Sequence, residues 1–242
     1  MGNLNDESNF TPKLIANNVD KEPFTDINYI GAGMFYSVAT CNKKNMYSWG
    51  CGNNGRLGHG NEHSLNLPKK IRFFEDNKIS VKSFSCGDTH IAIVNNTDTL
   101  YSWGSGTYGK LGHGNSQDYN LPMKIEFLKN SKTDLVSCGS NDTIAVLSDL
   151  KIFAWGKNSY GMLGTTKLPD NNITIPALVN LVLEDARLGI TEVSVGSLHV
   201  LFKLSNGDLF ACGSAANGIS GIQNQKDRFH QDHQYIKSQF AK

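Results

Sequence analysis

The hydrophobic and polar positions of the chain alternate over short runs that predict β-strands. Residues 79–86 alternate with one slip, and residues 89–94 form an apolar, β-branched run. Residues 99–103 end in large aromatic side chains and follow a turn-forming sequence at 95–98. Runs of this length, bounded by Asn, Gly and Asp, are typical of strands joined as hairpins.

A run that contains a proline supplies a fourth strand. Residues 121–128 include Pro122, which is followed three residues later by Ile125. Proline cannot donate a hydrogen bond to a strand ladder, so it suits the first residue of a strand or a sheet edge. No segment of the chain has a convincing helical period. The pattern therefore predicts an all-β protein.

Three landmarks recur in the same order four times, which indicates internal repeats. The first is an aromatic strand end at Trp49, Trp103 and Trp155, with Cys212 in the fourth place. These anchors lie 54, 52 and 57 residues apart. A loop with glycines spaced by 5 and then 3 residues follows each anchor: Gly50, Gly55 and Gly58; Gly104, Gly109 and Gly112; Gly156, Gly161 and Gly164; Gly213, Gly218 and Gly221.

The other two landmarks divide the chain into units. A glycine precedes each anchor by 16 residues, at Gly33, Gly87, Gly139 and Gly196. A proline with an aliphatic residue three positions later opens each unit, at Pro12, Pro68, Pro122 and Pro176. We therefore predict units at 12–67, 68–121, 122–175 and 176–221, between an N-terminal tail (1–11) and a C-terminal tail (222–242).

About four strands in each unit of roughly 50 residues predict one blade of a β-propeller. Neighbouring blades bury each other's faces, and Trp49 and its equivalents are expected to pack between them. The fourth unit is eroded, since Cys212 replaces Trp and Ser220 replaces the leucine found at Leu57. No proline-led strand follows Gly221, and residues 222–242 carry no repeat landmark.

The glycines and histidines are interpreted as structural. The glycine loop lacks the Lys-Ser/Thr pair of a phosphate-binding loop, so its glycines are expected to take positive φ or to allow close backbone approach. His90 and His199 share one repeat position and are expected to make structural hydrogen bonds. His59 and His113 follow the loops and are interpreted as solvent-facing. No catalytic residue, metal site or cofactor is predicted.

Composition narrows the function classes. The 242 residues carry a net charge of +1, from 23 basic and 22 acidic side chains, which gives no electrostatic reason to expect nucleic acid as a partner. No apolar run approaches the roughly 20 residues of a membrane span. Five scattered cysteines and a polar start predict free thiols and an intracellular protein, in cytoplasm or nucleus.

The landmarks together resemble the regulator of chromosome condensation repeat family. The matching residues are Gly87-Asp88-Thr89-His90, Tyr101-Ser102-Trp103-Gly104, the glycine loop that follows, and Pro122. The resemblance extends over residues 12–221 and implies a propeller of four-stranded blades, usually seven. Four units are about half of that ring. They imply a partial ring or open arc that needs further repeats or another chain to close it, with a closed four-bladed ring as the alternative.

The resemblance implies two functions. The family includes scaffolding domains of ubiquitin ligases, kinases and ciliary proteins, so a non-enzymatic protein-interaction scaffold is expected. The alternative is a nucleotide-exchange factor or regulator for a Ran-like small GTPase, because that family member places acidic residues near the Gly-Asp-x-His turn on its GTPase-facing side. Asp88 matches that pattern and Asp142 lies near it. Lys167, Asp170 and Asn171 lie in the longest irregular segment, a candidate partner-binding excursion.

Overall fold

The computed structural model describes residues 13–15, 18–21, 24–41, 45–165, 172–181, 188–214 and 216–221, together with the backbone of 234–236. Within these residues the chain forms four antiparallel four-stranded sheets, and in each sheet the strands are neighbours in chain order. The prediction of an all-β protein made of four-stranded propeller blades is therefore confirmed. In the same part of the chain, no helix has the length and apolar character needed to cross a bilayer.

Each sheet runs from an inner strand to an outer strand. The first sheet holds β1 (Ile27–Ala32), β2 (Tyr36–Cys41), β3 (Asn45–Gly50) and β4 (Leu65–Lys70). The second holds β5 (Val81–Cys86), β6 (His90–Asn95), β7 (Leu100–Gly104) and β8 (Tyr119–Lys124). The third holds β9 (Thr133–Cys138), β10 (Asp142–Leu147), β11 (Ile152–Gly156) and β12 (Ile173–Leu178). The fourth holds β13 (Ile190–Val195), β14 (His199–Leu204), β15 (Leu209–Gly213) and β16 (Gln234–Ile236).

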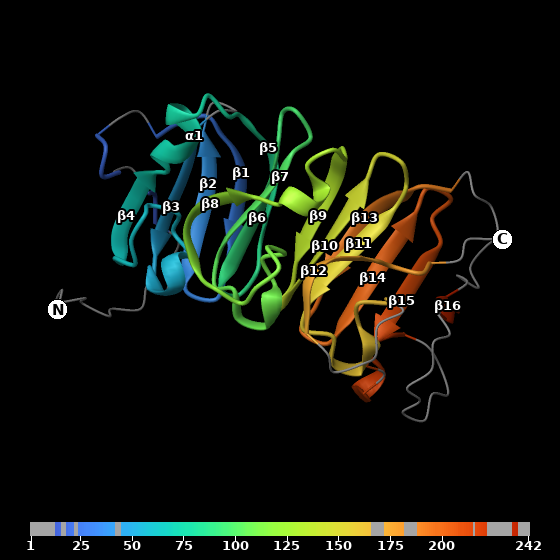
Figure 1. Cartoon of the computed structure of the whole chain (residues 1–242). Helices are drawn as coiled ribbons and strands as arrows, with labels where there is room; N and C mark the ends of the chain where they lie inside the picture. The colour runs from blue at the N-terminus through green and yellow to red at the C-terminus, as the bar shows by residue number, and fades with distance from the viewer. Residues whose placement is uncertain are drawn as a thin grey trace.

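The sheets form an open arc. Figure 1 shows them side by side in chain order, from the blue first sheet on the left to the red fourth sheet on the right. The two interior sheets are covered on both faces, and for that reason every residue of β6 and β10 is buried. The inner strand of the first sheet, β1, is mostly exposed. The sheets do not close into a ring, as expected for a partial propeller.

Short helical turns connect the strands. A 3₁₀ turn follows the third strand of each sheet, at η1 (Asn53–Gly55), η2 (Thr107–Gly109), η4 (Ser159–Gly161) and η5 (Ala216–Gly218). Between one sheet and the next lie α1 (Arg72–Asp76) and η3 (Glu126–Leu128). The five residues of α1 are too few to leave a helical period in the sequence. Its Phe74 ring packs edge-on against Trp103, with ring centroids 5.9 Å apart.

The sheets begin at a different place from the repeat units of the sequence. Pro68, Pro122 and Pro176 open the predicted units, but they lie in β4, β8 and β12, the last strands of their sheets. These are outer-edge strands, where a residue without an N–H is tolerated. The fourth sheet follows the same plan, because β16 pairs with β15 although it lies in the segment predicted to be a C-terminal tail.

The glycine loop after the third strand of one sheet packs on the following sheet, and each such contact between neighbouring sheets is called a joint below. The glycines of the four predicted loops all have positive φ. Gly109 shows why the loop can dock closely, because a Cβ there would lie 2.6 Å from the Thr174 Cα of the third sheet. The indole of Trp155 donates a hydrogen bond to the carbonyl of Lys110 in the same loop, at 2.9 Å. Trp103 makes the equivalent bond to Arg56 across the first joint, at 3.2 Å.

Each joint also holds a polar side chain at the start of the second strand. The Tyr36 hydroxyl donates to the carbonyls of Gly87 and His90 in the next sheet, at 2.8 and 2.6 Å. The Nε2 of His90 hydrogen-bonds the Thr143 hydroxyl at 2.8 Å, so this histidine has the structural role expected from its repeat position. The third joint has Asp142 in this place.

The Asp142 carboxyl has an unusually high pKa. Its side chain is buried, and its Oδ2 has no hydrogen-bond partner among the described residues. Burial raises the pKa of this carboxyl to about 7, because an ionised carboxylate loses its hydration between the sheets. Burial also holds His90 neutral by lowering its pKa to about 3. The third joint is therefore the one whose central side chain titrates near neutral pH.

We expect Gly109→Ala to destabilise the protein more than Gly218→Ala. Both glycines have positive φ, which costs a non-glycine residue about 1 kcal/mol. A Cβ at Gly109 would meet the backbone of the following sheet, whereas one at Gly218 would meet none of the described atoms within 4 Å. The additional loss at Gly109 should be about 2 kcal/mol in the free energy of unfolding, measured by urea titration. An equal loss of unfolding free energy in the two variants would contradict this expectation, because it would show that the third sheet moves to accommodate the added methyl group.

We expect Asp142→Asn to remove one component of the pH dependence of stability. The folded pKa lies above the value of about 4 for an unfolded Asp, so its contribution is fully present below pH 4 and is lost as pH rises through 7. Thermal melts should show equal stability of the two proteins at pH 4 and greater stability of Asp142→Asn at pH 8, on the order of a few kcal/mol. Parallel profiles would contradict the assignment.

Candidate functional site

The inner strands converge on one cavity. Its volume is about 350 Å³, and each of the four sheets contributes three consecutive residues at the end of its inner strand: Ala32–Met34, Cys86–Asp88, Cys138–Ser140 and Val195–Ser197. These positions are equivalent in the repeat. The cavity therefore lies at the axis of the arc, where loops from all four sheets are within reach of one ligand or partner.

The glycines of the cavity wall set the distance between sheets. A Cβ at Gly33 would lie 2.6 Å from the carbonyl oxygen of Gly87, and one at Gly139 would lie 2.8 Å from that of Gly196. Gly87 meets the carbonyl of Gly139 in the same way. Each of these glycines also makes room for the polar side chain at the start of its own second strand. Because these glycines have no Cβ, the inner strands of neighbouring sheets can approach closely.

An apolar pair stands at the rim of this cavity. Met34 and Phe35 are 60% and 63% exposed. The equivalent pairs in the other units are Asp88–Thr89, Ser140–Asn141 and Ser197–Leu198. The backbone N–H of Met34 donates to the Asp88 carbonyl at 3.1 Å, so this corner is fixed to the second sheet. Exposed large apolar side chains on a backbone corner fixed in this way are typical of an interaction site.

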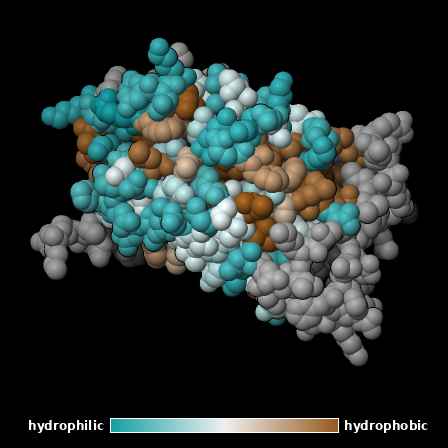
Figure 2. Space-filling view, viewed as in Figure 1, coloured by the Kyte–Doolittle hydropathy of each residue, from teal (hydrophilic) through white to brown (hydrophobic). Residues whose placement is uncertain are grey.

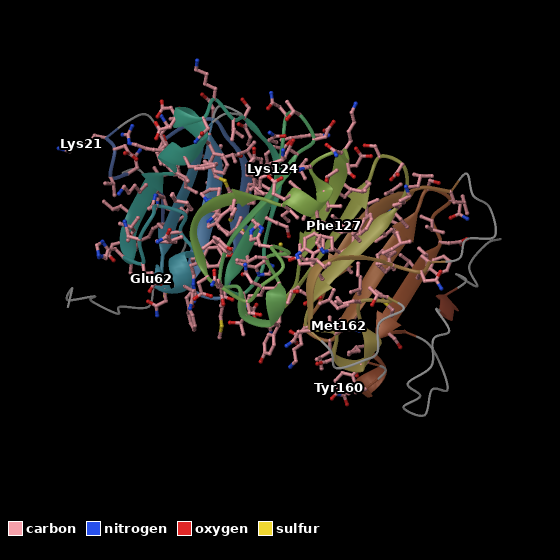
Figure 3. The ribbon with its side chains drawn as sticks, in the orientation of Figure 1. Lys21, Glu62, Lys124, Phe127, Tyr160 and Met162 are labelled. Carbon is pink, nitrogen blue, oxygen red and sulfur yellow. The ribbon has the colours of Figure 1, made fainter. Side chains whose placement is uncertain are left out.

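The loops after the third strands form an outer rim on the same side of the arc. Tyr108 and Tyr160 have left-handed φ values of 64° and 57°, at a repeat position where Asn54 and Asn217 stand in the other units. Asn tolerates this conformation better than Tyr does. The ammonium of Lys157 lies over the Tyr108 ring, 5.2 Å from its centroid. Figure 3 shows Tyr160 at the lower edge of the third sheet, pointing away from it.

The predicted partner-binding residues fall in three different environments. Asp88 is partly exposed and lines the cavity. Asp142 is 1% exposed, inside the joint between the third and fourth sheets, so it is not part of the surface. Lys167, Asp170 and Asn171 lie outside the described residues. Met34 and Phe35 were not singled out from the sequence. They differ from the mostly polar residues at the same repeat positions, and this difference becomes informative only when the structure brings the ends of the inner strands together.

The loop histidines correct one interpretation of the sequence. His59 and His113 are not solvent-facing but half-buried, and each Nε2 lies 3.0 Å from the hydroxyl of a strand serine, Ser48 or Ser102. Burial lowers the pKa of His59 to about 4, and also lowers that of His113. Both imidazoles are therefore neutral at pH 7 and hold the loop against its own sheet.

The cavity offers little chemistry. Burial raises the pKa of the Cys86 and Cys138 thiols to about 12, so both stay protonated and are poor nucleophiles. Among the described residues, no group of three His, Cys, Asp or Glu side chains is placed to hold a metal ion.

Hydrophobic surface also gathers beyond the cavity. Figure 2 shows brown surface over the region of the third and fourth sheets, while the first two sheets present mostly teal surface. A second hollow of about 170 Å³ has an apolar lining that includes Leu150, Leu178, Leu188 and Ile190, where the third sheet connects to the fourth.

The chain is similar to several known proteins over most of its length. It is 37% identical to the human E3 ubiquitin-protein ligase HERC2 over 176 residues, which are 71% of this chain and 4% of that protein. It is 32% identical to the ultraviolet-B receptor UVR8 of Arabidopsis thaliana over 202 residues, 84% of this chain and 44% of the receptor. The chain thus spans less than half of these relatives.

Two solved structures share the fold. Human WBSCR16 superimposes with a TM-score of 0.77 at 20% identity, covering 90% of this chain and 55% of that one. The yeast protein Prp20, in the crystal structure of Kap60 bound to yeast RCC1, superimposes with a TM-score of 0.73 at 17% identity, covering 88% and 49%. This chain therefore spans about half of each of these two structures.

A family model settles which proteins this chain belongs with. The model for the regulator of chromosome condensation (RCC1) repeat matches residues 45–94, 97–146 and 151–202, well over half of the chain. A second model of the same repeat matches residues 81–110. With the four-stranded sheets, the glycine loops and the tryptophan joints already described, these matches show that the chain belongs to the RCC1 repeat family.

Proposed function

We propose that the chain is a non-enzymatic protein-interaction scaffold whose partner docks over the axial cavity. The observation that carries the proposal is the exposed Met34–Phe35 pair at the cavity rim, where the other units have mostly polar residues. Methionine and aromatic side chains are enriched at protein interfaces, and a few such anchors supply most of the binding energy. Asp88 adds a charged contact beside them.

The relatives support a role in binding rather than catalysis. By name they are a ubiquitin ligase, an ultraviolet-B receptor and, in mouse Nek9, a serine/threonine-protein kinase that is 26% identical over 198 residues. Since these activities differ while the repeats are shared, the shared repeats do not account for any one of the activities. The yeast protein Prp20p, which has this fold, is described as binding Gsp1p and histones.

Regulation of a small GTPase is the second candidate. Asp88 favours it, because this carboxylate is partly exposed at the cavity and stands in the Gly-Asp-Thr-His turn. Asp142 does not add to it, because it is buried in a joint. Among the described residues, Asp88 is the one acidic side chain at the cavity wall. Exchange would need several polar contacts placed on the nucleotide site of the GTPase.

We expect Phe35→Asp to abolish capture of the partner while the fold is retained. The ring is 63% exposed, so its replacement leaves the core intact, whereas a carboxylate in a buried interface is unfavourable. Proteins captured by the purified chain should fall at least about tenfold with Phe35→Asp. Leu121→Asp is the matched control, since Leu121 is also an exposed apolar residue but lies on the outer strand β8. Equal loss in both variants would contradict the proposal.

For a scaffold, we expect no acceleration of nucleotide release from a small GTPase. Fluorescent GDP bound to a Ran-type GTPase is mixed with micromolar chain, and the rate of release is compared with that of the GTPase alone. Acceleration that disappears in Asp88→Ala, while Phe35→Asp leaves it unchanged, would favour exchange activity over the scaffold.

A further inference from the structure

The third joint, between the third and fourth sheets, is held by weaker polar contacts than the two joints before it. In those two joints the tryptophan indole of the following sheet donates to a loop carbonyl, at 3.2 and 2.9 Å. In the third joint Cys212 takes the place of the tryptophan, and its thiol donates to the Met162 carbonyl at 2.9 Å. A thiol is a weak hydrogen-bond donor. The fourth sheet is therefore held less firmly to the loop of the third.

The strand that faces Asp142 offers it no hydrogen bond. At the second joint, the Thr143 hydroxyl of the facing strand bonds the His90 ring at 2.8 Å. Val200 holds the Thr143 position in the register of the fourth sheet, and it is fully buried. Asp142 is only 1% exposed, and its Oδ2 has no partner among the described residues. A buried polar atom without a partner is rare and calls for a physical reason.

Asp142 faces a carbonyl oxygen instead. At the first joint the Tyr36 hydroxyl donates to the carbonyl of Gly87 at 2.8 Å. The equivalent carbonyl at the third joint belongs to Gly196 and lies beside the carboxyl, since a Cβ on Gly139 would be 2.7 Å from Asp142 Oδ1 and 2.8 Å from the Gly196 oxygen. A carboxylate and a carbonyl are both acceptors, whereas a protonated carboxyl can donate. The geometry of this joint therefore fits the protonated form and opposes the ionised one.

The groups around Asp142 do not reverse this preference. Burial is the largest effect and raises the pKa of the carboxyl, while the Asn141 N–H, at 3.3 Å, lowers it. The charges of Asp88 and Lys110 follow, with opposite signs. Three other titratable side chains border the joint: the thiols of Cys138 and Cys212, whose pKa burial raises to about 12, and the imidazole of His199, which lies against Gly196. Burial therefore decides the charge state of Asp142.

The contact between Asp142 and Gly196 lies directly behind the wall of the axial cavity. The fourth sheet contributes Val195–Ser197 to that wall, and its inner strand β13 packs against β9 and β10 (Figure 1). On the exposed side the hydroxyls of Ser140 and Ser197 lie 3.0 Å apart. An exposed hydrogen bond competes with water and contributes little. The buried contact is therefore the stronger constraint on this part of the wall.

We propose that the proton on Asp142 closes the cavity end of the third joint, and that loss of this proton to solvent opens it. In the protonated form the carboxyl donates to the Gly196 carbonyl and holds Val195–Ser197 in the cavity wall. In the ionised form two acceptors face each other, which favours a separation that lets water reach the carboxylate. Cys212 becomes accessible in the same movement. The opening requires no partner, so it is independent of the proposed scaffold function.

Labelling of Cys212 measures the opening in the full chain. Its thiol lies at the Met162 carbonyl inside the joint, so a thiol reagent reaches it when the joint opens. Dithiodipyridine is used because it reacts in acid as well as at neutral pH, and mass spectrometry of peptides identifies the labelled cysteine. Asp142→Asn keeps an amide donor in place at every pH. The ratio of the wild-type rate to the Asp142→Asn rate should be near one at about pH 4 and at least about tenfold higher at about pH 7.5.

Two controls separate local opening from other causes. Asp134→Asn removes an exposed carboxylate of the same sheet, which accepts from the Ser148 hydroxyl at 2.7 Å, and should keep the wild-type profile. In the wild type itself, Cys86 at the first joint should not share the acceleration of Cys212. Equal acceleration at Cys86 would overturn the proposal, because the whole fold would then be opening. A rate ratio that stays constant with pH would overturn it as well.

Discussion

The structure depends on the joint by which each glycine loop meets the next sheet. A loop carbonyl accepts the indole N–H of the following tryptophan, as Lys110 does from Trp155, and the glycine beside it lies against backbone. A single four-stranded sheet cannot bury both of its faces, so its stability comes from its neighbours. The same few contacts therefore fix the strand faces, the curvature of the arc and the position of the axial cavity.

The joints are alike in backbone and different in their central side chains. Tyr36, His90 and Asp142 occupy one position and face the next sheet with a phenol, a neutral imidazole and a carboxyl. Burial favours the uncharged form of the last two, and among the described residues no ion pair offsets it. Because the backbone geometry is the same at each joint while the central side chain differs, each joint has its own stability. The joint at Asp142 is the one that responds to pH near neutrality.

Much of the fold could be predicted from the sequence, and less of the candidate site. Spacings of glycine, tryptophan and proline recur because every sheet must solve the same packing problem, and they predicted the four-stranded sheets and the partial ring. They did not predict β16, which carries no landmark, or α1, which is shorter than two helical turns. Among the acidic candidates, Asp88 and Asp142 look alike in sequence, but one lines the cavity and the other is buried.

The sequence by itself determined the family, the strand content and the repeat, since these follow from residue types at fixed spacing along one chain. The tertiary structure decided which residues share a surface. Met34 and Phe35 became a rim because four inner strands end at one cavity. Such relations depend on distances across sheets, and spacing along the chain does not contain them.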